Sequence, residues 1–418
     1  MFRSTMTAIS LVMLASAVLA ATPEEVVDTY SDIAEAAYGD SLTTAQALRE
    51  AVSALVENPS EETLSAAREA WTAARVPYQQ TEAFRFGNPI VDDWEGRVNA
   101  WPLDEGLIDY VAENTPSAED NELAQLNVIA NPSLELSGET LDASTITPEL
   151  LSGSLHEAGG IEANVASGYH AIEFLLWGQD LNGTGAGAGT RPYTDYIQGD
   201  DCTGGNCDRR GQYLVAATDL LISDLEEMVA NWAEGGEARK AVTDNPQAGL
   251  NAMLTGMGSL SYGEQAGERM KLGLMLNDPE EEHDCFSDQT HYSHFYDGLG
   301  IENVYLGRYK RTDGSEISGP ALSTLVAKAD PAVDKALKAG LKASVAALSN
   351  LKDKAEGGMA YDQMLAPGNT EGEATIMAAV DALVAQTQEI ERAVAVLGLS
   401  KIKFEGSDSL DNPNAVFQ

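Results

Sequence analysis

Residues 163–179 read ANVASGYHAIEFLLWGQ and form the most informative segment of the 418-residue chain. The segment is almost wholly apolar or aromatic, and its basic and acidic side chains are His170 and Glu173. A helix that is apolar nearly all round is buried, and residues three apart share one face of a helix. The segment therefore predicts a buried helix on which His170 and Glu173 are neighbours.

A carboxylate buried on such a helix needs a compensating group. Its burial costs several kcal/mol unless the carboxylate is paired, protonated or bound to a metal. In one interpretation, His170 and Glu173 form a hydrogen-bonded pair that satisfies itself in the core. In the other, they are two ligands of a metal ion, because a neutral imidazole and a carboxylate suit iron or zinc. The residues alone leave both interpretations open.

A metal site needs a further ligand from another part of the chain, and Glu82 is the first candidate. A long helix is expected to open at Ser60 and to run to about Phe86. One stripe of this helix carries Trp71, Arg75, Tyr78 and Glu82. The acid at the end of an otherwise aromatic stripe is predicted to be buried, and Arg75 is expected to orient it.

Other candidate ligands lie outside this stripe. They are Asp104, Glu268 and the segment 282–291, which contains His283, Asp284 and Asp288. Three of the five histidines, His283, His291 and His294, fall within twelve positions. The alternative for each of these residues is a surface loop or a helix cap, and we favour that alternative for His294.

The remaining pattern indicates an all-α protein. Ala-rich segments favour helix, and no long run alternates β-branched with polar residues, which excludes an all-β fold. Helical patterns are expected near residues 147–177, 209–234, 245–277, 318–350 and 373–397. Residues 87–119 are expected to be rich in loops.

The charge balance restricts the partners. Lys and Arg number 25 against 66 Asp and Glu, which gives a formal net charge of −41. Such a surface repels phosphate backbones and anionic lipid headgroups, so we expect neither nucleic acid nor a membrane surface as a partner. It is compatible with cations, although adaptation to a salty habitat explains the acidity equally well.

The first twenty residues are typical of a secretory signal peptide. Arg3 supplies a short basic start, residues 9–19 are largely apolar, and small residues precede a cleavage site expected after Ala20, with Ala17 as the alternative. No Cys follows the apolar stretch, so a lipoprotein anchor is not expected there. No later segment is apolar for long enough to span a membrane. We expect an exported, periplasmic protein.

The three cysteines fit an oxidising compartment. Cys202 and Cys207 are expected to pair, because the four residues between them allow a tight turn. Cys285 is then either buried or bridged to one of the other two. A zinc-ribbon site needs a second pair of cysteines, which the chain lacks.

The motifs resemble those of the imelysin family. Residues 168–173 match its Gly-x-His-x-x-Glu motif, and the residues that follow fit as well. The likeness extends over nearly the whole chain after residue 20. It includes Thr81 to Gly87, Asn99 to Glu105, Cys202 to Arg210 and Glu281 to Asp288.

The resemblance implies an all-helical protein of two four-helix-bundle-like halves, related by pseudo-symmetry, with the site where they meet. The expected division is residues 1–20 as signal peptide, 21–205 as the bundle with the motif helix, and 206–418 as the second bundle. A weak echo between Glu82–Gly87 and Glu268–Gly273 agrees with such a duplication.

The resemblance also implies a link to iron uptake. The leading hypothesis is an exported protein that binds a metal ion or an iron-bearing ligand through His170, Glu173 and Glu82, with iron favoured over zinc. Envelope iron-transport components are its expected partners, and many family members are anchored to the outer membrane. One alternative is a metallopeptidase with Glu173 as the catalytic residue, although the His-Glu-x-x-His motif is absent. The other is an interaction protein whose buried pair only specifies packing.

Overall fold

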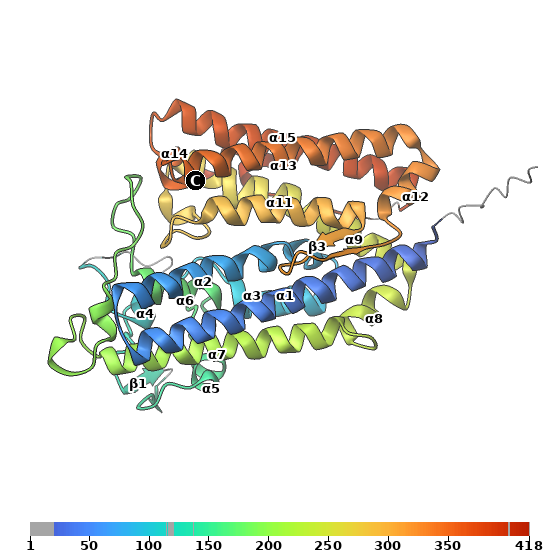
Figure 1. The fold of residues 1–418 in the computed structure, drawn as a ribbon. Helices are drawn as coiled ribbons and strands as arrows, with labels where there is room; N and C mark the ends of the chain where they lie inside the picture. Colours follow the sequence, from blue (N-terminus) through green and yellow to red (C-terminus); the bar gives the residue numbers. More distant parts are fainter. Residues whose placement is uncertain (1–20, 114, 116–120, 137, 400–401, 418) are drawn as a thin grey trace, which may run out of the picture.

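The protein consists of two stacked layers of helices (Figure 1). This computed structural model describes residues 21–113, 115, 121–136, 138–399 and 402–417, so the predicted signal peptide lies outside the described residues. Helices dominate the described chain, and its strands form two short hairpins. The all-α prediction is therefore confirmed.

The first bundle is built on a long N-terminal helix. It comprises α1 (Pro23–Glu57), α2 (Glu61–Gln79), α6 (Gly168–Trp177) and α7 (Cys207–Trp232). Helix α1 packs against α2 and α7, and α6 lies against α2 and α7. Capping boxes at Thr22 and Ser60 start α1 and α2, because each side chain accepts a hydrogen bond from the backbone three residues later. Shorter helices α3 (Pro89–Asn99) and α8 (Glu237–Thr243) cover this bundle.

The second bundle stacks on α2 and on the short helix η1 (Glu82–Phe84). It comprises the continuous helical run α9 (Pro246–Ser259) and η6 (Leu260–Leu272), with α11 (Thr290–Leu306), α13 (Pro331–Glu356) and α15 (Thr370–Val396). Helix α13 packs against α11 and α15, and η6 packs against α11 and α15. Helix α11 also contacts α2, so it lies where the two bundles meet (Figure 1).

Short elements complete the chain. The remaining α-helices are α4 (Glu105–Ile108), α5 (Pro148–Leu150), α10 (Gly273–Leu276), α12 (Leu322–Ala329), α14 (Tyr361–Leu365) and α16 (Asp408–Asp411). The 3₁₀-helices are η1 (Glu82–Phe84), η3 (Ala158–Gly160), η4 (Tyr193–Tyr196), η5 (Gly199–Asp201), η7 (Pro279–Glu281) and η8 (Ala415–Phe417), and η2 (Leu151–Leu155) and η6 are π-helical. The antiparallel hairpins are β1 (Ser133–Leu136) with β2 (Glu139–Asp142), and β3 (Arg308–Lys310) with β4 (Glu316–Ser318).

Helix α7 belongs to the first bundle by its packing. A division at residues 205 and 206 would assign it to the second, yet it packs on α1 and α6. The Tyr213 hydroxyl donates to the carbonyl of Ala166, and Trp94 of α3 donates to the carbonyl of Asp224. The packing therefore assigns α7 to the first bundle. Pseudo-symmetry between the halves stays a prediction.

Helix α2 ends earlier than its aromatic stripe suggests. It stops at Gln79 rather than near Phe86, so Glu82 lies in the short helix η1. The backbone N–H and the hydroxyl of Thr81 both donate to the carbonyl of Tyr78, which closes a turn. The expected loop-rich passage at 87–119 also contains α3, whose Val91, Trp94 and Val98 are buried.

His294 lies inside helix α11, and not in the surface loop or helix cap that we favoured for it. The sequence of this helix shows no clear apolar stripe because the helix packs on neighbours from both bundles. A side chain at Gly300 would come within 2.6 Å of the Gln80 backbone, so α11 approaches the end of α2 closely. His294 is 0% exposed, which corrects the prediction.

The cysteines behave as expected. Cys202 and Cys207 form a disulfide bond, and Cys285 is buried as a free thiol within the described chain. Of the helices in the described ranges, none is both long and apolar enough to cross a membrane.

Burial of His294 predicts a specific acid sensitivity. Desolvation lowers its pKa to about 3, against about 6.5 in an unfolded chain. Between these values the unfolded chain binds the proton and the folded chain does not, so acidification favours unfolding. Below pH 6.5 we expect the unfolding free energy of the wild type to fall by about 1.4 kcal/mol per pH unit more than that of His294→Gln. Urea denaturation at pH 7, 6 and 5 measures the difference, and parallel profiles would contradict it.

Candidate metal centre

The motif glycine sets where α6 begins. Gly168 has φ +84°, and a Cβ there would lie 2.4 Å from the carbonyl oxygen of Val98. Only glycine tolerates both the backbone conformation and this contact with α3. The next turns are anchored by Trp71, whose Nε1 donates to the carbonyl of Tyr169 at 2.9 Å. The helix therefore holds His170 and Glu173 at a fixed depth in the core, where both are 0% exposed.

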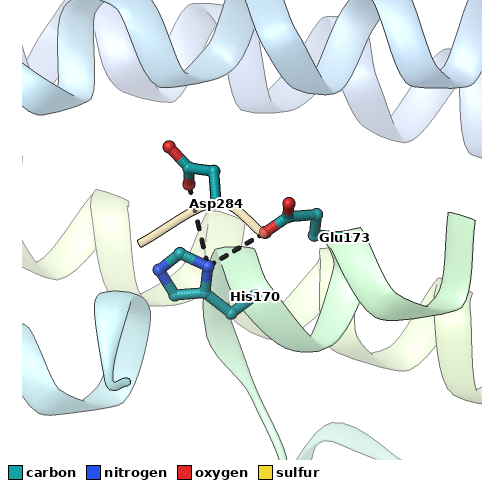
Figure 2. A group of neighbouring side chains, drawn as sticks. All are labelled: His170, Glu173 and Asp284. Carbon is teal, nitrogen blue, oxygen red and sulfur yellow. Dashed lines mark hydrogen bonds and ion pairs between the residues drawn. The ribbon is translucent and has the colours of Figure 1, made fainter. Parts of the chain in front are cut away.

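Asp284 joins His170 and Glu173 in one buried cluster (Figure 2). His170 Nδ1 lies 3.0 Å from Glu173 Oε2 and 3.8 Å from Asp284 Oδ1. One ligand atom from each residue lies within 4.8 Å of the others. Asp284 comes from the segment between η7 and α11, so the cluster joins the motif helix to a segment 111 residues after Glu173.

Arg75 of α2 compensates Asp284. Its Nη2 lies 2.8 Å from Asp284 Oδ1, and both side chains are buried. Ser293 donates its hydroxyl to Asp284 Oδ2. Arg75 Nη1 also donates to Asn99 Oδ1 at 2.6 Å. The prediction that Arg75 orients Glu82 is therefore wrong, because Asp284 takes the guanidinium.

Glu173 is buried beside neutral donors. The backbone N–H and hydroxyl of Ser287 donate to its Oε1 at 3.0 and 2.7 Å. Burial, followed by the negative charge of Asp284, raises the pKa of Glu173 well above its usual range. Within the described chain, Glu173 forms no ion pair with Lys or Arg. Its carboxyl group therefore favours a proton or a bound cation.

His170 is a neutral imidazole. Burial, together with the positive charges of Arg75 and Arg269, lowers its pKa well below the ordinary value. No group in the described part of the chain hydrogen-bonds its buried Nε2. The ring lies 4.8 Å from the ring of His283 and 5.1 Å from that of Trp101, measured between centroids.

His283 connects the cluster to a pocket. Asn99 Oδ1 accepts from Arg75, so its Nδ2 faces His283 Nε2 at 3.2 Å and donates to it. His283 also lines a pocket of about 360 Å³ between α3 and η6. Glutamates, among them Glu95, Glu264 and Glu268, outnumber the two arginines that line the same pocket, which makes its wall acidic. The arginines pair with Glu95 and Glu264.

Glu82 lies in a separate ion-pair network. Its Oε2 accepts a hydrogen bond from Arg269 Nη2 at 2.8 Å. Arg269 also contacts Asp297 at 3.1 Å and Glu264 at 2.7 Å. Glu82 is buried as predicted, but its partner is Arg269 of η6 and not Arg75. A role for Glu82 as a metal ligand stays a prediction.

The other predicted residues lie apart from the cluster. Asp104 precedes α4 and accepts a hydrogen bond from Asn121 at 2.6 Å. Glu268 is exposed on η6 and faces the pocket. Asp288 belongs to a different acidic group, with Asp180 and Asp362. The structure therefore unites His170, Glu173 and Asp284, with His283 and Arg75 alongside.

The sequence did not predict several polar residues around the cluster. They are Asn99, Ser287 and Ser293. It also did not predict Arg269 as the partner of Glu82. Asn99 follows Glu95 by four residues on α3, and its amide donates to that carboxylate at 3.0 Å. Ser287 and Ser293 flank the candidate histidines, but serine is too common in loops and caps to signal a site alone.

The donor set fits a divalent metal ion. One imidazole and two carboxylates are ligands that suit iron or zinc. If both acids are ionised, Glu173 and Asp284 carry two negative charges against one positive charge on Arg75. A divalent cation would offset the excess. In its absence, a proton on Glu173 meets the same need, in agreement with its raised pKa.

Comparison with known proteins agrees with the motif. The sequence model of imelysin, Peptidase_M75, matches residues 34–390, which is most of the chain. Iron-regulated protein A of Synechococcus elongatus is 35% identical over 75 residues, or 18% of this chain and 21% of that relative. The matched stretch thus covers about a fifth of the curated relative.

A solved structure shows the same fold. It is the crystal structure of a protein assigned as a precursor of iron-regulated protein A from Parabacteroides distasonis. The two chains share 19% identity with a TM-score of 0.64, and the match covers 90% of this chain and 94% of the other. At this identity the likeness concerns the fold alone. The family match and the Gly-x-His-x-x-Glu helix together show that this chain belongs to the imelysin family.

Proposed function

We propose that this protein binds ferrous iron through His170, Glu173 and Asp284, as an exported, iron-linked member of its family. The observation that carries the proposal is Glu173, a fully buried carboxyl group that forms no ion pair with Lys or Arg in the described chain. It lies beside an imidazole that burial keeps neutral and therefore able to coordinate. Two carboxylates and one imidazole give mostly oxygen donors.

Iron is favoured over zinc on two grounds. Structural zinc sites are commonly rich in cysteine and histidine, whereas two of these three ligands are carboxylates. The relatives described above are named as iron-regulated proteins. Zinc remains the competing ion in the experiment below.

An acidic pocket offers the ion a route to the cluster. Its wall carries Glu95, Glu264 and Glu268 and includes His283, whose ring packs against that of His170. The chain carries a formal charge of −41, which attracts cations to the surface. The bound ion is therefore proposed to be cargo that the protein carries. Envelope iron-transport components are the proposed partners. The Cys202–Cys207 disulfide supports an oxidising compartment.

Substitution Glu173→Gln tests the proposal while preserving shape. A glutamine oxygen can still accept from Ser287, but the negative charge is lost. We expect anaerobic calorimetric titration with Fe²⁺ to show one ion per wild-type chain, and affinity at least about tenfold weaker in Glu173→Gln. Glu62→Gln is the matched control, because Glu62 is exposed on α2. Equal Fe²⁺ affinity in Glu173→Gln and wild type would refute the proposal. Zinc in place of iron in protein purified from its native compartment, measured by elemental analysis, would refute its choice of metal, because most nitrogen and oxygen sites bind Zn²⁺ more tightly than Fe²⁺ in vitro.

The same variant separates binding from hydrolysis. A metallopeptidase would cleave a denatured protein substrate, lose activity with a chelator and lose it again in Glu173→Gln. We expect no such chelator-sensitive, Glu173-dependent cleavage. Its appearance would replace cargo binding with catalysis at the same residues.

A further inference from the structure

We propose a second cation site, in which Asp180, Asp288 and Asp362 bind a hard divalent cation of the calcium class. One carboxylate oxygen from each residue lies within 4.8 Å of the others. The three acids come from three distant segments: the turn after α6, the segment before α11, and α14. This group is separate from the cluster of His170, Glu173 and Asp284.

Buried, unpartnered oxygens point to a ligand. Asp362 is 1% exposed, and no hydrogen bond from the described residues reaches its Oδ1 or Oδ2. Asp288 Oδ1 likewise lacks a partner in the described chain. Glu282 is also 1% exposed, and its buried Oε2 is unsatisfied by any described residue. In the described ranges, no basic residue is paired with the three acids of the group or with Glu282, whose pKa their charges raise.

Because these acids lie close together, each disfavours the ionised form of its neighbours. Burial, followed by the negative charges of Asp362 and Asp180, raises the pKa of Asp288 to about 7. Burial and the charges of Asp362, Asp288 and Asp180 raise the pKa of Glu282 well above its usual range. A cation would offset the repulsion that these shifts report.

The donor chemistry selects the class of cation. The three residues offer only carboxylate oxygens, which suit Ca²⁺, Mg²⁺ and Mn²⁺. The cluster at His170 adds an imidazole nitrogen, which suits iron. Asp180 and Asp288 are half-buried, which is compatible with water completing the coordination of Ca²⁺. Calcium is therefore the probe of choice.

A cation here would brace the iron-binding cluster. Asp288 directly follows Ser287, which donates to Glu173. Asp180 follows the C-terminal end of α6, and Asp362 lies on α14, which packs on α15 of the second bundle. The cation would therefore tie the motif helix and the segment that supplies Asp284 to the second bundle.

Thermal unfolding of the full protein tests this site with Asp362→Asn. In chelator, we expect the variant to be at least as stable as the wild type, because one buried negative charge is gone. In Ca²⁺ at about 100 times its Kd, we expect the wild-type Tm to rise by roughly 3 °C or more and that of the variant to stay constant. Asp381→Asn, at an exposed position on α15, is the matched control and should respond like the wild type.

Two further variants keep the test decisive. Asp180→Asn should abolish the calcium response independently, should Asp362→Asn fail to fold. His170→Ala should retain the response, so failure of the iron site and failure of this site are distinguishable. The proposal would be overturned if Ca²⁺ left the wild-type Tm unchanged, or if Ca²⁺ raised the Tm of both aspartate variants as much as that of the wild type.

Discussion

Replacement of His170 by alanine is expected to weaken Fe²⁺ binding by about 100-fold or more, or about 2.7 kcal/mol. His170 is the nitrogen donor of the cluster, and its Nδ1 faces both carboxylates (Figure 2). Its surroundings keep the ring neutral, so at pH 7 the imidazole can bind a metal ion without first losing a proton. Loss of a direct ligand should exceed the 10–100-fold effect typical of residues that only support ligands.

A control variant separates the loss of this ligand from the loss of any other histidine. His156→Ala is the control, because His156 is half-buried outside the cluster. Anaerobic calorimetry measures both variants, and far-UV circular dichroism confirms that each is folded. Fe²⁺ affinity within threefold of the wild type in His170→Ala would contradict the assignment. An equal loss in His156→Ala would show that the effect is not specific to this site.

Replacement of Arg75 by leucine is expected to destabilise the ion-free protein by about 3–5 kcal/mol. The guanidinium is 2.8 Å from Asp284 Oδ1, and both side chains are at most 2% exposed. Removal of one partner leaves a charge buried without compensation, which is the expensive outcome for a buried pair. The lost hydrogen bond to Asn99 adds to the effect.

A double-mutant cycle identifies the cause. Asp284→Asn should recover part of the stability lost in Arg75→Leu, because it removes the uncompensated charge. Arg49→Leu is the control: its pair with Asp219 is partly exposed, so we expect a loss of about 1 kcal/mol or less. Urea denaturation in chelator measures the four proteins of the cycle and the Arg49→Leu control. Strict additivity of Arg75→Leu and Asp284→Asn would contradict the proposed charge compensation.

The local sequence pattern was enough to predict the motif helix, but not the residues that contact it. An apolar surround and a spacing of three residues placed His170 and Glu173 together on a buried helix, as found. Glu82 was also correctly predicted to be buried. The choice between Glu82 and Asp284 as neighbour of His170 depended on where α2 ends. The turn at Thr81 moves Glu82 out of the Arg75 stripe and towards Arg269.

Helix α11 shows why the second half of the site was harder to predict. Its residues are polar and apolar on several faces, because neighbours from both bundles surround it. Hydrophobic periodicity identifies a helix that has one solvent-exposed face, so a helix without such a face gives no clear pattern. The same contacts bury His294 and place Ser293 beside Asp284.

The amino-acid sequence was enough to establish the helical class, the family motif and the Cys202–Cys207 pair, because each depends on neighbours a few residues apart. The assembly of Asp284 with His170, of Arg75 with Asp284, and of Asp362 with Asp288 was decided only by the stacking of the two bundles. These contacts join residues tens to hundreds of positions apart. Burial then turns ordinary acids into groups that favour a proton or a bound cation, since the free energy of a charge depends on its surroundings and not on its place in the chain.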